Sequence, residues 1–319
     1  MKHIIINDFG LFLGLKSQRL TIKKDGSIIN EVALNRIKTI QILSRGVSLS
    51  SDLINSCSQR GIKIFFNTFN SFSAIHSIYE HKSVMVRVKQ FEICQNQKGL
   101  ALAKQLIIGK LKNQRATLLY SSRNIKSEFK NTTIEFFDKS ILQLKNKKEL
   151  SKEFILGVEG VCANSYFEYL KTMQLLPNHF HTRTKRYSED LTNISLNYGY
   201  AILQNFIYKS CVNAGLEPYM GVLHTTRSAK PSLVLDIMEE YRSFVVDRNI
   251  IKLRAKLRDT KKFDTIKKDV AKNILNTLTK KYKYNHKKLT LESIIQRQVY
   301  KISGYFSGKN RYKSYIFRW

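Results

Sequence analysis

The chain has 319 residues, of which 43% are apolar and 25% charged, a composition typical of globular proteins with a sizeable core. Lysine and arginine number 55 against 24 aspartate and glutamate residues, and this net charge of +31 predicts a polyanionic partner, most simply a nucleic acid. The four cysteines, at positions 57, 94, 162 and 211, form no C-x-x-C pair, which excludes a zinc ribbon and a dense disulfide scaffold.

The first 80 residues are predicted to form a β-rich domain with one helix. Residues 19–22 and 28–32 are apolar, β-branched runs that flank Asp25-Gly26, a dipeptide typical of tight hairpin turns. Residues 36–43 alternate polar and apolar, as a half-buried strand does. A short helix is expected from Ser51 to a stop at Gly61, followed by strands over residues 62–66 and 72–78.

After about residue 84 the apolar spacing changes to three and four, which is the period of helices. The same pattern predicts helices over residues 100–111, 154–170, 190–214 and 232–246. We therefore expect an α+β chain with a boundary near residues 78–84: a small N-terminal β-rich domain, residues 1–80, and a larger all-α domain, residues 84–319.

No segment is predicted to enter a membrane. The apolar run at the N-terminus is interrupted at Asn7 and Asp8, so it is too short for a signal peptide. The longest uncharged stretch, residues 191–208, contains too many polar side chains for a bilayer core. We expect a soluble, cytoplasmic protein with free thiols.

Positive charge is concentrated near the C-terminus. Residues 252–319 contain 20 basic and 4 acidic side chains, and 14 of the basic ones lie between Lys252 and Lys288. A one-signed excess favours contacts with phosphates over a merely solvated helical face. From residue 297 onward, aromatic and basic residues are interleaved, a pattern that fits stacking on bases and packing back on the core equally well.

Nucleotide-binding and nucleophile motifs are missing, but carboxylates occur in two informative places. Glu159 lies in a small, apolar segment between two glycines, where a carboxylate is costly unless it is paired or binds a metal. Its alternative is a solvent-facing helical glutamate. His179-Phe180-His181 is interpreted as part of a loop rather than a metal site.

The second place is the segment from residue 215 to 242. On a helix, Asp236, Glu239 and Glu240 are spaced i, i+3, i+4 and would share one face, with His224 just upstream. Carboxylates with a histidine suit a hard divalent cation, and Arg227, Lys230 and Arg242 would add phosphate contacts. A solvated helix with a structural histidine is the alternative, and the pattern alone leaves both open.

Several motifs together resemble one family. They are Glu159-Gly-Val-Cys-Ala-Asn-Ser-Tyr-Phe, Asp190-Leu-Thr-Asn193, Gly221-Val-Leu-His224, and Lys230-Pro-Ser-Leu-Val-Leu-Asp236-Ile-Met-Glu239-Glu-Tyr-Arg242, with Asn113-Gln114-Arg115 after a long helix. Their order and spacing resemble the CRISPR spacer-acquisition integrase, the first-numbered CRISPR-associated (Cas) protein, over essentially the whole chain. The chain departs from many relatives in having Arg186-Tyr-Ser-Glu189 where they have prolines, which puts the path of that loop in doubt.

The resemblance implies a metal-dependent DNA endonuclease and integrase that inserts spacer DNA into a CRISPR array by attack of a 3′-hydroxyl on a repeat phosphodiester. It implies Mg²⁺ or Mn²⁺ held by Glu159, His224 and Glu239, with Asp236 as a further catalytic group. It also implies a homodimer that assembles with the small second CRISPR-associated protein, the N-terminal domain contributing to dimer, partner and DNA contacts. DNA contacts are expected at five basic residues: Arg227, Lys230, Arg242, Lys252 and Arg254.

Two other functions remain open at this stage. A related integrase of a mobile element would use the same chemistry on the ends of that element. A non-catalytic structural DNA-binding protein would bind by charge and would not need Glu159, His224 and Glu239.

Overall fold

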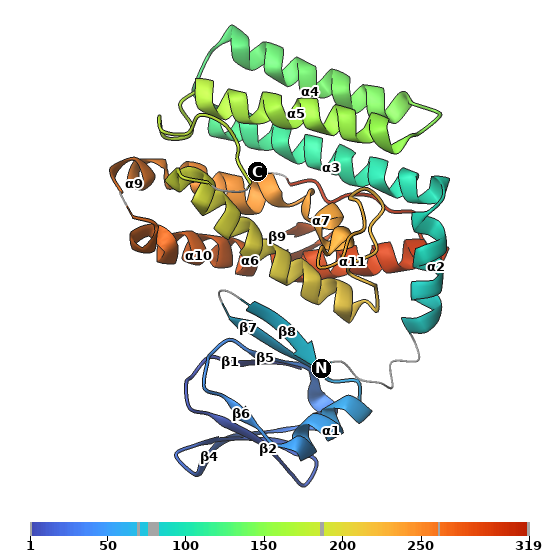
Figure 1. Ribbon diagram of the computed structural model, residues 1–319, viewed down its shortest axis with the longest axis vertical. Helices are drawn as coiled ribbons and strands as arrows, with labels where there is room; N and C mark the ends of the chain where they lie inside the picture. Colours follow the sequence, from blue (N-terminus) through green and yellow to red (C-terminus); the bar gives the residue numbers. More distant parts are fainter. Residues whose placement is uncertain (1, 69–70, 76–82, 186–187, 261, 318–319) are drawn as a thin grey trace. The chain divides into compact units, whose positions relative to one another are not determined.

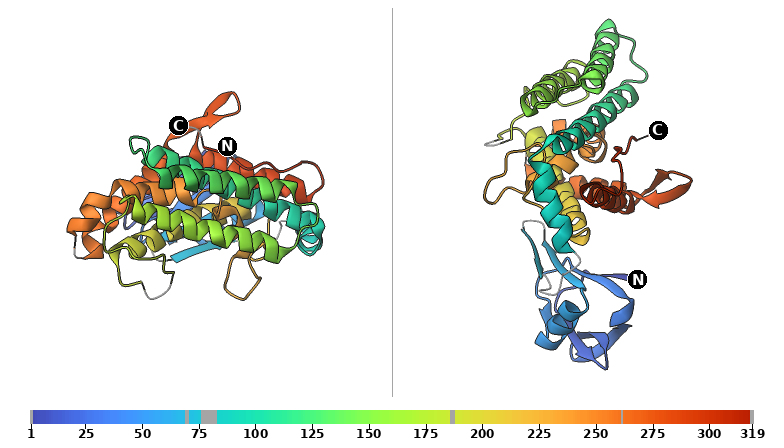
Figure 2. Two further views of the ribbon diagram at one scale, coloured as in Figure 1. Left: turned by 90° about the horizontal axis from the view of Figure 1, so that it is seen from above. Right: turned by 90° about the vertical axis from the view of Figure 1, so that its right-hand side faces the viewer.

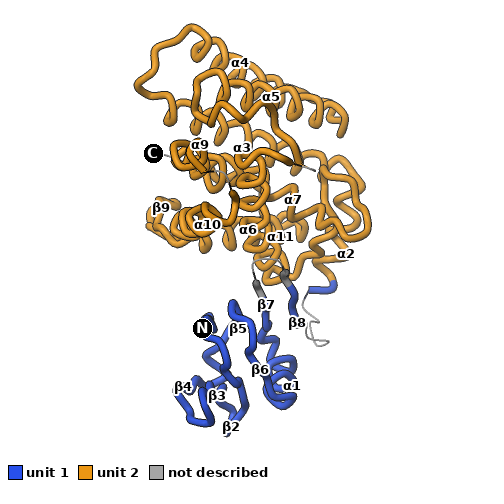
Figure 3. Tube along the Cα trace, turned by 60° about the vertical axis from the view of Figure 1, so that its left-hand side comes forward, with its two compact units in different colours: residues 1–84 blue, residues 85–319 orange. Residues whose placement is uncertain are grey.

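The chain folds as two compact units, residues 1–84 and residues 85–319 (Figure 3). The computed structural model describes residues 2–68, 71–75, 83–185, 188–260 and 262–317. Most of the boundary region predicted from the sequence, and part of the loop at residues 186–189, therefore lie outside the described residues. Within these ranges, no helix is long and apolar enough to cross a membrane.

The N-terminal unit contains two four-stranded sheets and helix α1 (Figure 1). One sheet has the order β1-β5-β7-β8, with parallel pairs except for antiparallel β7 and β8, and the other has the order β4-β3-β2-β6. Leu13, Leu20, Ile40 and Leu53 are fully buried and join both sheets and α1 in one core. The elements are β1 (Lys2–Ile6), β2 (Phe12–Lys16), β3 (Arg19–Lys24), β4 (Ser27–Ala33), the 3-10 turn η1 (Leu34–Arg36), β5 (Ile37–Ile42), β6 (Ser48–Leu49), α1 (Ser51–Gln59), β7 (Lys63–Thr68) and β8 (Ser71–Ile75).

The turn and cap signals of this unit are confirmed. Asp25 and Gly26 both have positive φ, 48° and 80°, which is the backbone that a two-residue hairpin turn requires. Helix α1 starts after Ser50, whose hydroxyl accepts from the Leu53 amide at 3.2 Å, and Gly61 follows it with a φ of 65°. The strand predicted to end at residue 78 is described only as far as Ile75.

The second unit is predominantly helical, so the predicted fold class is confirmed. Helices α3, α4 and α5 pack together on one side, and α6, α10 and α11 form the other (Figures 1 and 2). The short segment of α7, the π-helix η3 and α8 contacts both α3 and α6, and so it lies in the core between them. The bounds are α2 (Val84–Cys94), α3 (Gln97–Ser121), α4 (Glu128–Asn146), α5 (Lys152–Thr172), α6 (Leu191–Asn213), α7 (Ser232–Met238), η3 (Arg242–Asp247), α8 (Arg248–Lys252), α9 (Arg254–Asp259), α10 (Phe263–Thr279), β9 (Lys281–Tyr284), β10 (Lys287–Thr290) and α11 (Leu291–Phe306).

This unit also contains a feature that was not predicted, the antiparallel hairpin β9–β10 between α10 and α11. It projects from the helices in both views of Figure 2. The basic stretch from Lys252 to Lys288 is therefore not one helical face, because it runs through α8, α9, α10 and the hairpin.

The segment after α11 packs back on the core at Tyr312 and Phe317, whereas Tyr300 within α11 is exposed. Phe317 is buried and stacks on Phe244 with an interplanar angle of 12°. Asn113, inside α3 rather than after it, donates to the carbonyls of Glu240 and Tyr315 at 2.8 and 3.0 Å and accepts from the Phe317 amide at 3.1 Å. One buried amide side chain thus joins three distant segments. Trp319 lies outside the described residues.

Candidate active site

A cavity of about 840 Å³ in the helical unit is lined by three of the four candidate catalytic residues. Glu159 comes from α5, His224 from the loop between α6 and α7, and Glu239 from the turn that follows α7. The fold therefore brings three segments that are distant in sequence to one cavity. Its volume is in the range of about 300–1,000 Å³ that is usual for ligand sites.

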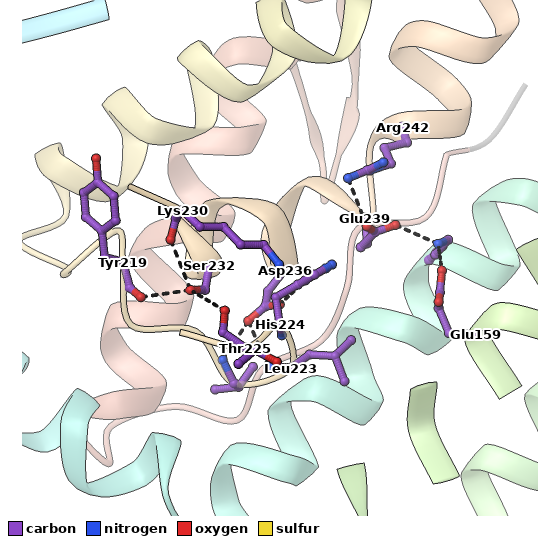
Figure 4. A network of polar contacts seen from close by, with 12 residues as sticks. Glu159, Tyr219, Leu223, His224, Thr225, Lys230, Ser232, Asp236, Glu239 and Arg242 are labelled. Carbon is purple, nitrogen blue, oxygen red and sulfur yellow. Dashed lines mark hydrogen bonds and ion pairs between the residues drawn. The ribbon is translucent and has the colours of Figure 1, made fainter. Parts of the chain in front are cut away.

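Lys110 of α3 occupies the space between the two glutamates. Its ammonium group donates to Glu159 Oε1 and lies 2.7 Å from Glu239 Oε2. Arg242 Nη2 lies 3.2 Å from Glu239 Oε1 (Figure 4). The Lys110 side chain is only 8% exposed. Sequence reasoning missed Lys110 because it is one of 55 basic residues and nothing in the pattern of α3 marks it as buried.

The charges at this cluster are fixed by mutual pairing. Burial alone would raise the pKa of Glu239, but Arg242 and Lys110 outweigh it and lower that pKa to about 2. Burial would lower the pKa of Lys110, but Glu239 and Glu159 raise it above its usual value. Glu239 and Lys110 are therefore both ionised at neutral pH, and the two cations balance the two carboxylates.

Asp236 is buried behind His224 and does not line the cavity. Its Oδ2 accepts from the amides of Val222 and Leu223 at 2.6 and 3.0 Å, and its Oδ1 accepts from the His224 amide at 2.9 Å. The same Oδ1 lies 2.6 Å from His224 Nδ1 (Figure 4). Asp236 thereby holds the loop and, as the acceptor of a hydrogen bond from Nδ1–H, favours the tautomer in which Nε2 has the free lone pair that could bind a cation.

Glycine is required where this loop approaches α7. A Cβ atom on Gly221 would lie 2.5 Å from Asp236 Oδ2 and 2.8 Å from backbone carbon of Ser232. Both contacts are closer than real Cβ atoms make, so any side chain at this position would push the loop away from the carboxylate.

The expectation that Asp236, Glu239 and Glu240 share one face is wrong. Helix α7 ends at Met238, and the turn that follows separates the three carboxylates. Glu240 accepts from the Tyr312 hydroxyl at 2.7 Å, away from the cavity. Burial raises the pKa of Glu240 to about 7, although hydrogen bonds from Tyr312 and its neighbours oppose the shift.

Basic side chains form another wall of the cavity, and two of them, Arg183 and Lys185, were not singled out from the sequence. Arg183 and Arg242 lie 5.3 and 4.8 Å from the ring centroid of Tyr200, and Arg183 donates to the side-chain oxygens of Asn193 and Asn197 at 2.9 and 2.6 Å. Lys185 also lines the cavity. This arrangement explains the motif that contains Asn193, since its amide fixes a guanidinium at the cavity. Cations on a ring face and in fixed positions suit a phosphate.

Of the five basic residues proposed from the sequence as DNA contacts, only one lines the cavity. Arg242 lines the cavity, whereas Arg227, Lys230, Lys252 and Arg254 are not among the residues that do. Arg227 and Lys230 close a bridged turn, and Lys252 and Arg254 end α8 and start α9. His179, in the loop ahead of α6, forms a hydrogen bond of 2.9 Å between its Nε2 and the hydroxyl of Thr192 in α6, as a structural histidine would.

The donor set fits a divalent cation. Two carboxylates and an imidazole face one cavity, and the ammonium group between Glu159 and Glu239 shows that this pair accommodates a cation. In the part of the chain that is described, no three His, Cys, Asp or Glu side chains converge closely enough to hold a metal as they stand.

Comparison with known proteins decides the family. The model of the family described as CRISPR associated protein Cas1 matches residues 4–286. The chain belongs to the Cas1 family. It is 45% identical, over 100% of both chains, to a protein named CRISPR-associated endonuclease Cas1 1 from Francisella tularensis subsp. novicida (strain U112).

Two solved structures have a similar fold to this Cas1 family member. A partial Cas6-RT-Cas1–Cas2 complex matches with a TM-score of 0.74 at 20% identity, covering 99% of each chain. A casposase bound to integration product matches with a TM-score of 0.71 at 22% identity, covering 98% of this chain and 93% of the other. At these identities the likeness shows the shared fold.

Proposed function

We propose that the chain is a metal-dependent DNA endonuclease and integrase that inserts spacer DNA into a CRISPR array. The observation that supports this most is the single cavity lined by Glu159, His224 and Glu239 beside basic side chains. The full-length relative at 45% identity is named an endonuclease of the CRISPR system, and a protein of similar fold is bound to an integration product. The cellular location is proposed to be the cytoplasm, where the array is.

The proposed reaction is a transesterification. A 3′-hydroxyl attacks a phosphodiester of the repeat, a new P–O bond forms, and the 3′-oxygen of the cut strand leaves with a proton. Mg²⁺ or Mn²⁺, held by Glu159, His224 and Glu239, would supply charge for the developing oxyanions when bound. The imidazole favours Mn²⁺ somewhat. Arg183, Lys185 and Arg242 would bind and orient the phosphate, and Asp236 would hold the ring of His224.

Strand transfer is the assay that tests this assignment. Glu159→Gln, His224→Ala and Glu239→Gln should each lose orders of magnitude in joining a short duplex with free 3′ ends to supercoiled target, because a ligand is removed. Folding and DNA binding should persist. Glu168→Gln is the matched control, since Glu168 lines the same cavity but has no assigned role, and it should stay active. Near-native transfer by Glu159→Gln would refute the assignment.

The two alternatives predict different results. A non-catalytic DNA-binding protein would show no transfer in any variant. An integrase of a mobile element would join the ends of that element in preference to short duplexes without them. The name of the 45% relative favours the CRISPR function.

The partners are proposed to be DNA, a second copy of the chain, and the small second CRISPR-associated protein. Joining two spacer ends to two repeat ends needs two active sites at a fixed separation, which a symmetric homodimer supplies. A structure of similar fold comes from a Cas1–Cas2 complex. Light scattering should report about twice the chain mass; an active monomer would contradict the dimer.

The β9–β10 hairpin is proposed as part of the DNA-binding surface. Residues 280–290 contain five lysines and no acidic residue. Lys283 and Lys288 are exposed and directly opposite each other in the register, a like-charge pair that costs stability unless an anion neutralises it. Tyr282 and Leu289, the neighbouring pair, are partly buried and pack against the core.

The salt dependence of affinity tests the hairpin. Each lost phosphate contact reduces the steepness of log affinity against log salt by about 0.9. The double variant Lys283→Gln with Lys288→Gln should therefore reduce it by about 2. The control double variant, Lys126→Gln with Lys139→Gln, removes the same total charge at two exposed lysines, one just before α4 and one within it. Equal slopes for the two double variants would mean that the hairpin is only a solvated surface.

A further inference from the structure

The charge balance at Lys110 has a consequence for how metal and DNA bind. Among the described residues, Glu159 forms an ion pair with Lys110, and Glu239 forms ion pairs with Lys110 and Arg242, so the two carboxylates are already neutralised. A divalent cation added to this set would leave a net charge of +2 in a site where Glu239 is 5% exposed and Lys110 6% exposed. Excess charge of that size in a poorly hydrated site is strongly unfavourable.

Removing Lys110 from the carboxylates relieves part of this charge. The lysine has a flexible four-carbon stem, so its ammonium group can leave the two carboxylates without moving α3. The cavity beside it is lined by Arg183, Lys185 and Arg242, which would hold an anion there. A phosphate in that cavity gives the displaced ammonium group a new partner and reduces the excess charge.

We propose that Lys110 couples the two ligands: it occupies the metal position in the DNA-free protein, and a DNA phosphate in the cavity draws it away so that the metal can bind. This proposal rests on the proposed function and adds that Mn²⁺ binding depends on DNA. The protein alone binds Mn²⁺ weakly, and the protein–DNA complex binds it tightly. Hydrolytic chemistry would then be restricted to protein that already holds DNA.

Linkage makes the proposal quantitative. If DNA raises the affinity for Mn²⁺ by some factor, then Mn²⁺ must raise the affinity for DNA by the same factor. Couplings between sites are typically about 5- to 150-fold, and we expect at least about tenfold here because one buried ion-pair network is exchanged for another.

The experiment measures Mn²⁺ binding by the electron paramagnetic resonance signal of the free ion. The wild-type chain is titrated alone and with a short duplex whose 3′ ends are dideoxy-terminated, so that no strand transfer occurs. Mn²⁺ bound to the duplex alone, and Mn²⁺ bound to the complex of the duplex with the double variant Glu159→Gln and Glu239→Gln, are measured as controls. Subtracting them leaves the Mn²⁺ that is bound at the carboxylates. Fluorescence anisotropy of the same duplex with and without Mn²⁺ gives the reciprocal factor.

Lys110→Met is the informative variant and Lys110→Arg is its charge-preserving control. Without DNA, Lys110→Met should bind Mn²⁺ about tenfold or more tightly than wild type, and its affinity should depend much less on the duplex. Lys110→Arg should retain weak binding without DNA. Circular dichroism establishes folding, and if Lys110→Met does not fold, Lys110→Gln takes its place.

Two results would overturn the proposal. One is wild-type Mn²⁺ affinity that is the same with and without the duplex. The other is Mn²⁺ binding to Lys110→Met no tighter than to wild type. Neither outcome depends on turnover, so the coupling can fail while strand transfer by the wild-type chain is intact, and loss of strand transfer would instead refute the proposed function.

Discussion

Asp236→Asn tests whether Asp236 acts by holding the loop at residues 222–224 through its buried carboxylate, rather than by facing a metal. The carboxylate accepts four hydrogen bonds, two at each oxygen, and all four donors come from residues 222–224. An asparagine has a single acceptor oxygen, so in either orientation its amide nitrogen faces two donors. At least two hydrogen bonds are lost and two buried donors are left without an acceptor.

The expected cost follows from those two bonds. Hydrogen bonds to a charged group contribute about 1.5–3 kcal/mol each, so the free energy of unfolding should fall by about 3–6 kcal/mol. For a unit of this size each kcal/mol shifts Tm by about 2–4 °C, which gives a decrease of roughly 6–24 °C. If the amide nitrogen takes the place of Oδ1, the His224 ring also loses its partner, and metal affinity should fall about 10- to 100-fold.

Differential scanning calorimetry and strand transfer below the new Tm measure both effects. Asp259→Asn is the control, because that carboxylate is 68% exposed and its loss should change the free energy of unfolding by less than about 0.5 kcal/mol. If Asp236→Asn left Tm and strand transfer unchanged, the loop would not depend on the carboxylate, and the reasoning from its four hydrogen bonds would be refuted.

Two further variants have definite expectations. Burial raises the pKa of Asp247 from 3.8 to about 6, so this buried group lowers stability as pH rises from about 4 to about 6, by roughly 3 kcal/mol in total. Asp247→Asn keeps an oxygen that accepts from the Tyr200 hydroxyl and should remove that loss of stability. Urea unfolding at several pH values should therefore show the free energy of unfolding of the variant rising relative to wild type between about pH 4 and 6. A difference that is the same at every pH would contradict the raised pKa of Asp247. Phe317→Ala removes the ring stacked on Phe244 and should lower the free energy of unfolding by about 3–5 kcal/mol in thermal unfolding, with DNA affinity unchanged. If the variant were as stable as wild type but bound DNA more weakly, the Phe317 ring would instead stack on a base.

Local signals in the sequence predicted local structure well. The Asp25-Gly26 turn and the Ser50 cap depend on the backbone preferences of a few neighbouring residues, and both were found where the pattern indicated. The fold class followed from the change of apolar period near residue 84. The β9–β10 hairpin was missed because its lysines match no alternating apolar pattern, although Asn285 at its turn has a positive φ of 52°.

The candidate site was predictable in its carboxylates and histidine but not in its cations. Glu159 and His224 stood out because their neighbours are small or apolar. Lys110 could not stand out, since its role depends on which of many lysines is enclosed by α3, α5 and the turn after α7. The orientation of Glu240 was predicted wrongly because a helix ended one residue before Glu239.

The contacts of Asn113 also bear on the order in which the chain can fold as it is synthesised. The N-terminal unit is complete within its own 84 residues, so it can fold while the rest is still being translated. The packing of helix α3 is completed later, because Asn113 forms hydrogen bonds with Glu240, Tyr315 and Phe317. The last two of these residues are synthesised about 200 residues after Asn113. Until residues 315–317 have left the ribosome, Asn113 lacks two of its three partners, although α4, α5 and the segment from α7 to α8 can already pack on α3. We therefore expect nascent chains stalled before residue 312 to have a protease-resistant N-terminal unit and a helical unit that is digested faster than in the full-length chain.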